Sequence, residues 1–204
     1  APEPGSHVDV RLPDGRVRQY SLCGDPADAS RYVVAVQRAD EGRGGSVWLH
    51  DHWQPGTVAH VSAPRNHFPL AEAAMHHLLI GGGIGITPLV AMAWHLERAG
   101  MSFTLAVLAR DRARAPFLRE LESRHGRRVQ VYLSRAAPAK RFDPAAALAS
   151  CGPGTHVYCC GPRRLTDAVR AAAAGWAEDR VHTESFVPLA DDGTPREPFE
   201  IMLK

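Results

Sequence analysis

A run of glycines between an apolar segment and a helical pattern constrains the fold of this chain more than any other feature. Residues 81–88 read GGGIGITP and directly follow the apolar segment 77–80. Glycines let backbone amides approach a bound group closely, and the start of a helix favours an anion. Pro88 suits a first helical turn, and Thr87 is expected to cap the same end. The sequence therefore predicts a strand, a loop with an anion site, and a helix.

The glycine run does not complete the usual dinucleotide fingerprint. Counted from Gly81 and Gly83, the third glycine would fall at position 86, which is Ile86. A glycine-rich turn that only lets a strand and a helix pack together is therefore an alternative interpretation.

Short apolar runs alternate with helical patterns through the second part of the chain. The expected strands cover residues 77–80, 104–108, 128–132 and 155–159, and the expected helices cover 88–98, 116–124 and 162–176. This alternation is typical of a parallel sheet with right-handed crossovers, whose ligands bind at the carboxyl ends of the strands. We therefore expect an α/β parallel-sheet nucleotide-binding domain over residues 73–187.

The first part of the chain has a different pattern. Between residues 7 and 69 apolar residues tend to alternate with polar ones, and Asp14-Gly15 and Pro55-Gly56 are turn signals. One such run covers residues 32–36. The pattern favours a small antiparallel sheet or β-barrel, expected over residues 1–72. At the other end, residues 188–198 resemble a linker and 199–203 resemble the start of another strand.

Charge and composition argue against several classes of function. The chain has 204 residues, of which 24 are Lys or Arg and 22 are Asp or Glu, with no basic arm for nucleic acid. No segment approaches the roughly 18 to 20 consecutive apolar residues that span a bilayer. The four cysteines lack the spacing of a disulfide framework or a zinc site, which favours reduced thiols. We expect a cytoplasmic protein that binds neither nucleic acid nor membrane.

A second candidate site lies at Cys159-Cys160-Gly161-Pro162, where the fourth expected strand ends. The small, polarisable thiol of Cys160 can lie against a nicotinamide ring without forming bonds, or it can be a buried apolar group. Spacing alone does not decide between the two.

A third candidate site is in the first part of the chain, where RQYS at 18–21 is followed by RGGS at 43–46. An arginine and a glycine-serine turn at a helix start are suitable phosphate ligands, and an aromatic ring beside a hydroxyl suits a flat heterocycle. A strand with exposed polar residues and an ordinary loop is the alternative.

Taken together, these motifs resemble those of the ferredoxin-reductase-like superfamily. They occur in its order: RQYS at 18–21, GGS at 44–46, GGIGITP at 82–88, CGP at 160–162 and ESF at 184–186. With APRNHFPL at 63–70 and HVYCC at 156–160, the chain is similar, more narrowly, to the phthalate dioxygenase reductase and vanillate O-demethylase reductase group. The resemblance covers nearly the whole chain.

The resemblance implies a flavin held by the first part of the chain. Tyr20 would lie against the ring and Ser21 near its reactive nitrogen, while the turn at 44–46 would take the phosphate. This group is similar to FMN users, with FAD, which most of the superfamily uses, as the alternative. Where such reductases often have a lysine, this chain has Gln37, which leaves one phosphate contact open. The expected flavin contacts are Arg18, Gln19, Tyr20, Ser21, Arg43, Gly44, Gly45, Ser46 and Phe186.

The same resemblance implies a site for NADH on the α/β part. The pyrophosphate would lie on the glycine loop, the adenosine ribose near Arg110 and Asp111, and the nicotinamide near Cys160. An acidic residue at position 111 mildly favours NADH over NADPH. The expected contacts are Gly82, Gly83, Ile84, Gly85, Thr87, Arg110, Asp111, Cys160, Gly161 and Pro162. Because hydride transfer belongs to the cofactors, catalysis would consist of placement by Tyr20, Ser21, Cys160 and Phe186.

The implied function is that of an NADH-dependent reductase component that passes electrons through FMN to a Rieske-type aromatic oxygenase or demethylase. Similar proteins carry a 2Fe-2S domain after the linker, and none of the four cysteines here fits its cluster motif. We therefore expect a chain truncated at both ends, without the first barrel strands and with only the linker and first strand of a 2Fe-2S domain in residues 188–204. A monomer is expected.

Three other functions compete with this one. A reductase for another acceptor, such as free flavin, a quinone or a separate ferredoxin, would share all of these residues. A non-catalytic nucleotide-binding module would have lost the ring-contacting residues, which are present. A metal site would use the pair His50 and His52 or the pair His76 and His77, but neither has helical spacing or a completing cluster, so we expect none.

Overall fold

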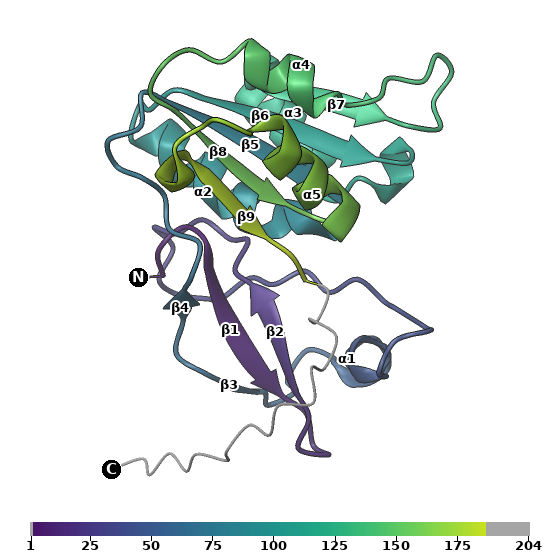
Figure 1. Cartoon of the computed structure of the whole chain (residues 1–204). Helices are drawn as coiled ribbons and strands as arrows, with labels where there is room; N and C mark the ends of the chain where they lie inside the picture. Colours follow the sequence, from purple (N-terminus) through teal and green to yellow (C-terminus); the bar gives the residue numbers. More distant parts are fainter. Residues whose placement is uncertain (1, 187–204) are drawn as a thin grey trace, which may run out of the picture.

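The computed structural model describes residues 2–186 and divides them into two parts that pack together (Figure 1). An antiparallel sheet with helix α1 lies in the lower half of the figure, and an α/β part with a parallel sheet lies above it. No helix within residues 2–186 is long and apolar enough to cross a membrane. The expected linker and strand at 188–204 lie outside the described residues.

The parallel sheet confirms the strands predicted from the apolar runs. Its five strands pair in the order β7-β6-β5-β8-β9, all parallel. They are β5 (His76–Gly82), β6 (Phe103–Ala109), β7 (Val129–Leu133), β8 (Thr155–Cys160) and β9 (Val181–Glu184). The sequence analysis did not include β9, whose end leads directly into Phe186.

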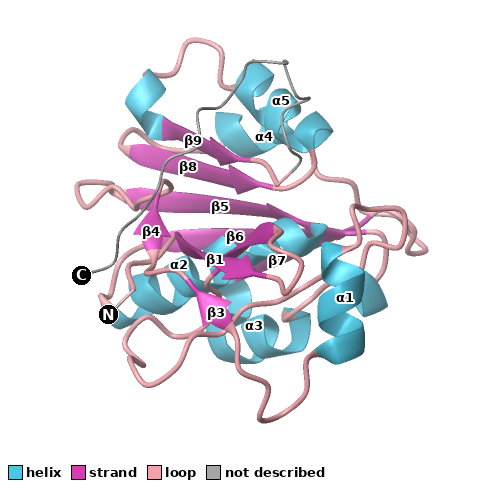
Figure 2. Cartoon of the chain, turned by 90° about the horizontal axis from the view of Figure 1, so that it is seen from below, coloured by secondary structure: helices cyan, strands magenta, loops and turns pink. Residues whose placement is uncertain are grey.

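Helices cover both faces of this sheet (Figure 2). One buried cluster joins β5 and β6 to α2 (Thr87–Arg98) and α3 (Leu118–His125). A second cluster, on the other face, joins β5 and β8 to α4 (Pro144–Ala149) and α5 (Arg163–Ala172). Successive β5 residues alternate between the two clusters, because side chains of a strand point to opposite faces. Short 3-10 turns lie at η1 (Gly83–Ile86), η2 (Arg112–Arg114), η3 (Gly126–Arg128) and η4 (Glu178–Arg180).

The helix predictions are confirmed in part. The expected helix 88–98 corresponds to α2, while α3 begins later than 116 and α5 ends before 176. The sequence analysis missed α4, whose alanine-rich sequence has little apolar periodicity. Its start is fixed by Asp143, whose carboxylate accepts from the amides of Ala145 and Ala146.

The antiparallel sheet expected in the first part is confirmed. Strand β1 pairs with β2 along its length, and with β3 and β4 near its two ends. The strands are β1 (Ser6–Arg11), β2 (Val17–Ser21), β3 (His60–Val61) and β4 (Arg65–Asn66). Helix α1 (Gly45–His52) packs Leu49 against Val10 and Leu12 of this sheet.

The run at 32–36 was wrongly interpreted as a strand. It makes one isolated bridge, between Val34 and Leu22. Val33 and Ala35 instead pack against the core of the α/β part. The apolar residues of this run therefore serve burial in an irregular segment.

The two parts share a core. Cys23 and Phe68 belong to the same buried cluster as Ile86 and Cys160. The hydroxyl of the fully buried Tyr158 accepts a hydrogen bond from the amide of Ala71 at 2.7 Å. In both views, α1 lies toward the side to which the parallel strands point (Figures 1 and 2). The antiparallel part therefore presents α1 on the side of the carboxyl ends of the parallel strands.

Candidate functional site

The glycine loop between β5 and α2 packs directly against the end of β8. A Cβ atom on Gly85 would lie 2.6 Å from the carbonyl carbon of Cys160 and from the amide nitrogen of Gly161. A Cβ atom on Gly82 would lie 2.8 Å from Cδ2 of Leu165. Real Cβ atoms do not come so close, so these glycines are required by packing. Packing alone is thus sufficient to account for glycine at positions 82 and 85, and the expected contact with a ligand stays a prediction.

Gly83 and Ile84 are different, because they form the tip of the loop. Gly83 has a left-handed φ of 57°, and a Cβ atom there would meet nothing within 4 Å. Both residues are partly exposed, while Gly82 and Gly85 are buried. The first amides of a helical segment have no partner within the helix. The tip can therefore take an anion on its backbone, as the sequence analysis proposed.

Thr87 was wrongly expected to cap α2. The helix continues directly from η1, so it has no free start at this residue. The hydroxyl of Thr87 is buried and donates to the carbonyl of Ile84 at 3.0 Å. Pro88 does occupy the first turn. The buried side chain of Thr87 thus holds the glycine loop by its hydrogen bond to Ile84.

Cys160 is fully buried at the end of β8. Its thiol lies 3.9 Å from Oε2 of Glu184, at the end of the neighbouring strand β9. Burial, with the nearby Glu184 carboxylate, raises the pKa of the Cys160 thiol far above its usual range. The thiol stays protonated, so it cannot act as a nucleophile. A nicotinamide ring would reach it only by displacing the atoms that cover it.

Glu184 is a residue that the site prediction missed. Burial raises the pKa of this carboxyl to about 6. An acidic residue placed at the carboxyl end of a strand, two positions before Phe186, is the signal that could have selected it. Glu184 and Cys160 together form a partly buried polar pair at the edge where the nicotinamide is expected.

The remaining residues of this edge lie as the motif order predicts. Gly161 is buried, and a Cβ atom added to it would lie 3.1 Å from Cα of Gly82. Pro162 is exposed and directly precedes α5. Phe186 follows β9 and is 43% exposed, which leaves its ring free to cover a ligand.

Arg110 and Asp111 follow β6 at the same edge. Arg110 is exposed. Asp111 caps η2: one carboxylate oxygen accepts from the amide of Arg114 at 3.0 Å, and the other accepts from its guanidinium at 3.2 Å. The carboxylate expected near the ribose is therefore already engaged within the protein.

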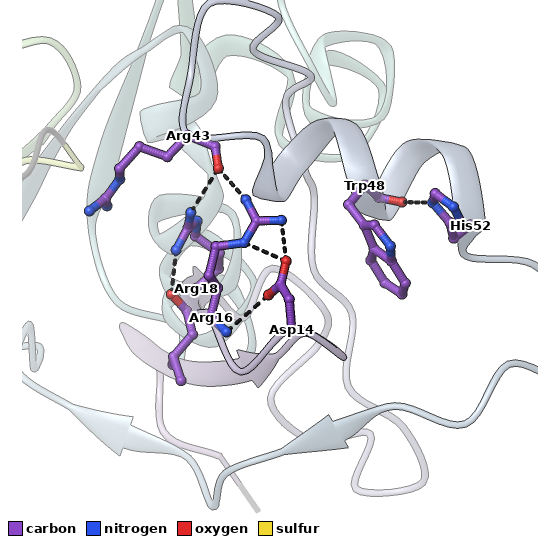
Figure 3. Close-up of polar contacts among 7 residues, drawn as sticks. Asp14, Arg16, Arg18, Arg43, Trp48 and His52 are labelled. Carbon is purple, nitrogen blue, oxygen red and sulfur yellow. Dashed lines mark hydrogen bonds and ion pairs between the residues drawn. The ribbon is translucent and has the colours of Figure 1, made fainter.

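A cluster of arginines surrounds the N-terminus of α1 (Figure 3). The guanidinium groups of Arg16 and Arg18 both donate to the backbone carbonyl of Arg43. The helix begins at Gly45 and is preceded by the N-cap residue Gly44, which has a left-handed φ of 72°, and no side chain caps it. The side chain of Arg18 lies over Gly45, where an added Cβ atom would be 2.5 Å from Nε. Any larger residue at position 45 would have to displace the side chain of Arg18.

Charge at this cluster is strongly positive. Asp14 is the acidic member, and it pairs with Arg16. Burial, then the neighbouring Arg43 and Arg16, lowers the pKa of Arg18, as expected where cations gather. A helix N-terminus adds a partial positive charge. The cluster and the free first-turn amides fit a phosphate group.

Arg16 was missed by the sequence analysis. Period-two alternation places Arg16, Arg18 and Tyr20 on one face of the strand, and this was the available signal. Gln37, which stands where a lysine was expected, is exposed. Its segment runs beside α1, since the amide of Ala39 donates to Oγ of Ser46 at 3.1 Å. Arg16 therefore supplies a cation at the cluster that Gln37 does not.

The ring-contacting candidates lie at the end of β2. Tyr20 is half-buried against the cluster of Val10, Leu12 and Leu49, and Ser21 is buried. Gln19 projects from the other face and lies 3.4 Å from Nε2 of His7. The structure thus places Arg18 and Tyr20 on the side of α1, and gives Gln19 a different environment.

The histidine pairs make ordinary hydrogen bonds. His50 contacts the carbonyl of Val36 at 2.7 Å, and His52 contacts that of Trp48 at 2.9 Å. His76 contacts Oγ of Ser102 at 2.8 Å, and His77 lies near two carbonyls. Within residues 2–186, no three potential metal ligands cluster.

Comparisons with known proteins agree with this architecture. No protein-family model matches the chain. It is 46% identical over 197 residues to the tert-butanol monooxygenase / tert-amyl alcohol desaturase reductase subunit of Aquincola tertiaricarbonis, covering 95% of this chain and 58% of that protein. It is 40% identical over 203 residues to phthalate dioxygenase reductase of Burkholderia cepacia, covering 98% of this chain and 63% of that protein.

A solved structure of phthalate dioxygenase reductase has the same fold. It superposes with a TM-score of 0.86 at 40% identity, over 94% of this chain and 61% of that one. The chain thus spans about three fifths of the length of these relatives. Within that span, the chain is similar in sequence and fold to oxygenase reductase components such as phthalate dioxygenase reductase and vanillate O-demethylase oxidoreductase.

Proposed function

We propose that this chain binds a flavin and a pyridine nucleotide and carries out electron transfer from NADH to the flavin within an oxygenase reductase. One observation carries the proposal. The arginine cluster at α1, which suits a phosphate, lies on the side to which the parallel strands point, where the glycine loop and Glu184 are found. A flavin anchored at α1 can therefore extend toward a nicotinamide bound at the sheet edge.

The charge of the cluster favours FMN as the flavin. A terminal phosphate monoester carries close to two negative charges near neutral pH. Arg16, Arg18 and Arg43, set against Asp14, leave an excess of two positive charges beside the helix N-terminus. This excess matches a terminal phosphate, while FAD would place a pyrophosphate with further groups at the same position.

Several of the predicted residues have a role in this arrangement. Arg18 and the amides of Gly45 and Ser46 hold the phosphate, and Tyr20 and Ser21 position the ring. The tip at Gly83 and Ile84 holds the pyrophosphate of the nucleotide. When bound, the flavin supplies a two-electron acceptor that releases electrons one at a time. The protein contributes placement, and Phe186 and the pair of Cys160 and Glu184 line the approach of the nicotinamide.

The acceptor is inferred from the relatives. The solved phthalate dioxygenase reductase is described as a modular structure for electron transfer from pyridine nucleotides to a 2Fe-2S centre. We propose the same order here, with a Rieske-type aromatic oxygenase or demethylase beyond the 2Fe-2S centre. The division into a flavin part, residues 1–72, a nucleotide part, 73–187, and a segment leading to the 2Fe-2S domain, 188–204, belongs to the same proposal.

We further propose that the protein works as a monomer in the cytoplasm. All four cysteines are free thiols, and three of them are buried. Such thiols suit a reducing compartment.

The test is reconstitution of the purified chain with FMN, FAD or riboflavin, followed by anaerobic addition of NADH. We expect FMN to bind most tightly and its visible absorption to bleach with NADH. Preferential binding of FAD would overturn the FMN assignment. A chain that binds none of the three flavins would overturn the proposed function.

A further inference from the structure

The face of the parallel sheet that carries α4 has a cavity that the proposed electron transfer does not use. Its volume is about 570 Å³, within the range of roughly 300 to 1,000 Å³ that small-molecule sites span. Its floor consists of side chains of β5, β6 and β7 that point to one face of the sheet: His76, Leu78, Thr104, Ala106, Gln130 and Tyr132. On β5 and β6 these residues are among the first four of the strand, whereas the glycine loop follows the last residue of β5. The cavity therefore lies away from the edge at which the nucleotide is expected.

The cavity exists because helix α4 covers only part of this face. The helix has six residues, and those that line the cavity, Ala146 and Ala147, have side chains too small to fill the space above the sheet. The antiparallel part packs on the opposite face, in the buried cluster that contains α2 (Figure 1). Some lining residues, such as Gln130 and Ser150, are exposed. The cavity is therefore open to solvent and accessible to a ligand.

The walls of the cavity suit a flat ring. Leu78 and Ala106 are buried at the floor. The rings of Tyr132 and Phe142 also line the cavity and meet edge to face, with centroids 5.1 Å apart and an interplanar angle of 81°. Both rings are partly buried, and aromatic rings pack favourably against further rings in stacked or edge-to-face geometry. The lining therefore favours an aromatic ligand.

Positive charge without an acidic partner lies at the same cavity. Arg141 lines it and makes no ion pair within residues 2–186. Nζ of Lys140 lies 4.5 Å from the centroid of the Tyr132 ring. The acidic lining residue is Asp143, whose carboxylate accepts from two amides of α4. A carboxylate is the anion that matches a free guanidinium, because it accepts two parallel hydrogen bonds from it.

We propose that this cavity binds a monocyclic aromatic carboxylate. The ring packs on Leu78 and Ala106 beside Tyr132 and Phe142, and the carboxylate accepts from Arg141. Neither the arginine cluster at α1 nor the tip of the glycine loop lines the cavity. Binding there is therefore independent of the flavin and of the nucleotide.

Cys151 provides a reporter of occupancy. It lines the cavity and is partly exposed, whereas Cys23, Cys159 and Cys160 are buried. Burial raises the pKa of the Cys151 thiol, and since the thiolate is the reactive form, alkylation should be slow enough to time. A ligand in the cavity should slow the alkylation of this cysteine further.

The test uses benzoate as the probe. Benzamide, which has no charge, and cyclohexanecarboxylate, which is not flat, serve as comparisons. The purified chain is treated with iodoacetamide at increasing concentrations of each compound, and alkylation of Cys151 is measured by peptide mass spectrometry. We expect benzoate to slow alkylation in a saturable manner. Benzamide should need about tenfold higher concentrations for the same effect, because it lacks the charge, and cyclohexanecarboxylate a few-fold higher, because it lacks the ring contacts.

Two pairs of variants locate the site, with benzoate affinity measured by titration calorimetry. Arg141→Ala should weaken benzoate binding about tenfold. Arg135→Ala, an exposed arginine of the same loop that does not line the cavity, should bind benzoate as the wild type does. Ala146→Trp should fill the cavity from an exposed position and abolish binding. Ala145→Trp, at the neighbouring exposed position outside the lining, should keep it.

Failure of benzoate to protect Cys151 overturns the proposal. Wild-type affinity for benzoate in Arg141→Ala or in Ala146→Trp overturns it as well. Binding of FMN, measured on the same preparation, tests the proposed function separately, so that either proposal can fail without the other.

Discussion

The candidate binding sites of the two parts of the molecule are made of different chemical groups. In the α/β part the candidate site consists of backbone groups. The glycine loop packs against the end of β8 and the start of α5, and buried glycines make that contact possible. In the antiparallel part the candidate site is made of partly exposed side chains, with Arg16 and Arg18 directed at the start of α1. A change in the glycine loop of the α/β part should therefore alter stability and binding together. A change in the arginine cluster of the antiparallel part should alter mainly binding.

The largest effect is expected for Gly85→Ala. The new Cβ would lie 2.6 Å from backbone atoms of Cys160 and Gly161, which cannot move without shifting β8. We expect the free energy of unfolding to fall by about 3 kcal/mol, measured by urea denaturation. Gly152→Ala is the control, since Gly152 has an ordinary φ and nothing within 4 Å, and it should change stability by less than about 0.5 kcal/mol. Equal stability of the two variants would show that the loop is not packed as described.

Arg18→Ala should weaken FMN binding by about 10- to 100-fold, because it removes a charged hydrogen-bond donor from the phosphate. Riboflavin, which has no phosphate, should bind the variant and the wild type equally. Urea denaturation should detect a loss of about 1 kcal/mol or less.

The control for this variant is Arg31→Ala, an exposed arginine paired with Asp28. It should leave both affinities unchanged. A parallel loss of riboflavin binding in Arg18→Ala would mean that the arginine shapes the ring site and does not serve the phosphate.

Glu184→Gln tests the buried pair at the nucleotide edge. Burial raises the pKa of Glu184 from 4.5 to about 6, so the folded state favours the protonated carboxyl. Its contribution to stability is present below pH 4.5 and is lost as the pH rises through about 6. Between these limits the wild type should lose about 1 to 2 kcal/mol more than the variant.

Urea denaturation across this pH range measures the difference. Glu178→Gln, which alters an exposed carboxyl on η4, should follow the wild-type profile. If Glu184→Gln also follows it, the carboxyl is solvated in the folded protein.

The smallest effects concern the contacts that join the two parts. Tyr158→Phe removes the buried hydroxyl that accepts from the amide of Ala71, and should cost about 1 kcal/mol of unfolding free energy. Asp25→Asn breaks an ion pair with Arg98, which is 54% exposed, and should cost about 0.5 kcal/mol or less. The reverse order would mean that surface charge, and not the shared core, holds the parts together.

The sequence predicted the α/β part better than the antiparallel part, for a physical reason. Strands buried on both faces are continuous apolar runs, which β5, β6 and β8 are. Strand β9 escaped notice because its four residues include polar ones at the edge of the sheet. In the antiparallel part, the segment 32–36 is apolar because Val33 and Ala35 pack against the core of the α/β part. An apolar pattern shows that a segment is buried, but it does not show which element covers the segment.

The same limit applies to the site. Residue types and motif order were enough to select Arg18, the glycine turn at 44–46 and the loop tip at Gly83. They did not reveal that Arg16 and Arg18 both donate to the carbonyl of Arg43. Nor did they reveal that the guanidinium of Arg114 donates to the carboxylate of Asp111. Thr87 was assigned a cap because η1 was not foreseen. The first depends on a tertiary contact, and the other two depend on local backbone geometry that motif order does not specify.

The most direct test measures how fast NADH bound to the α/β part reduces a flavin bound to the antiparallel part. The FMN-loaded chain is mixed anaerobically with NADH in a stopped-flow spectrophotometer, and the experiment is repeated with NADH deuterated at the transferred position. The account predicts that the flavin absorption bleaches in a single turnover and that deuterium slows the bleaching, because the nicotinamide and the flavin meet directly. A flavin that binds but stays oxidised at saturating NADH would contradict it.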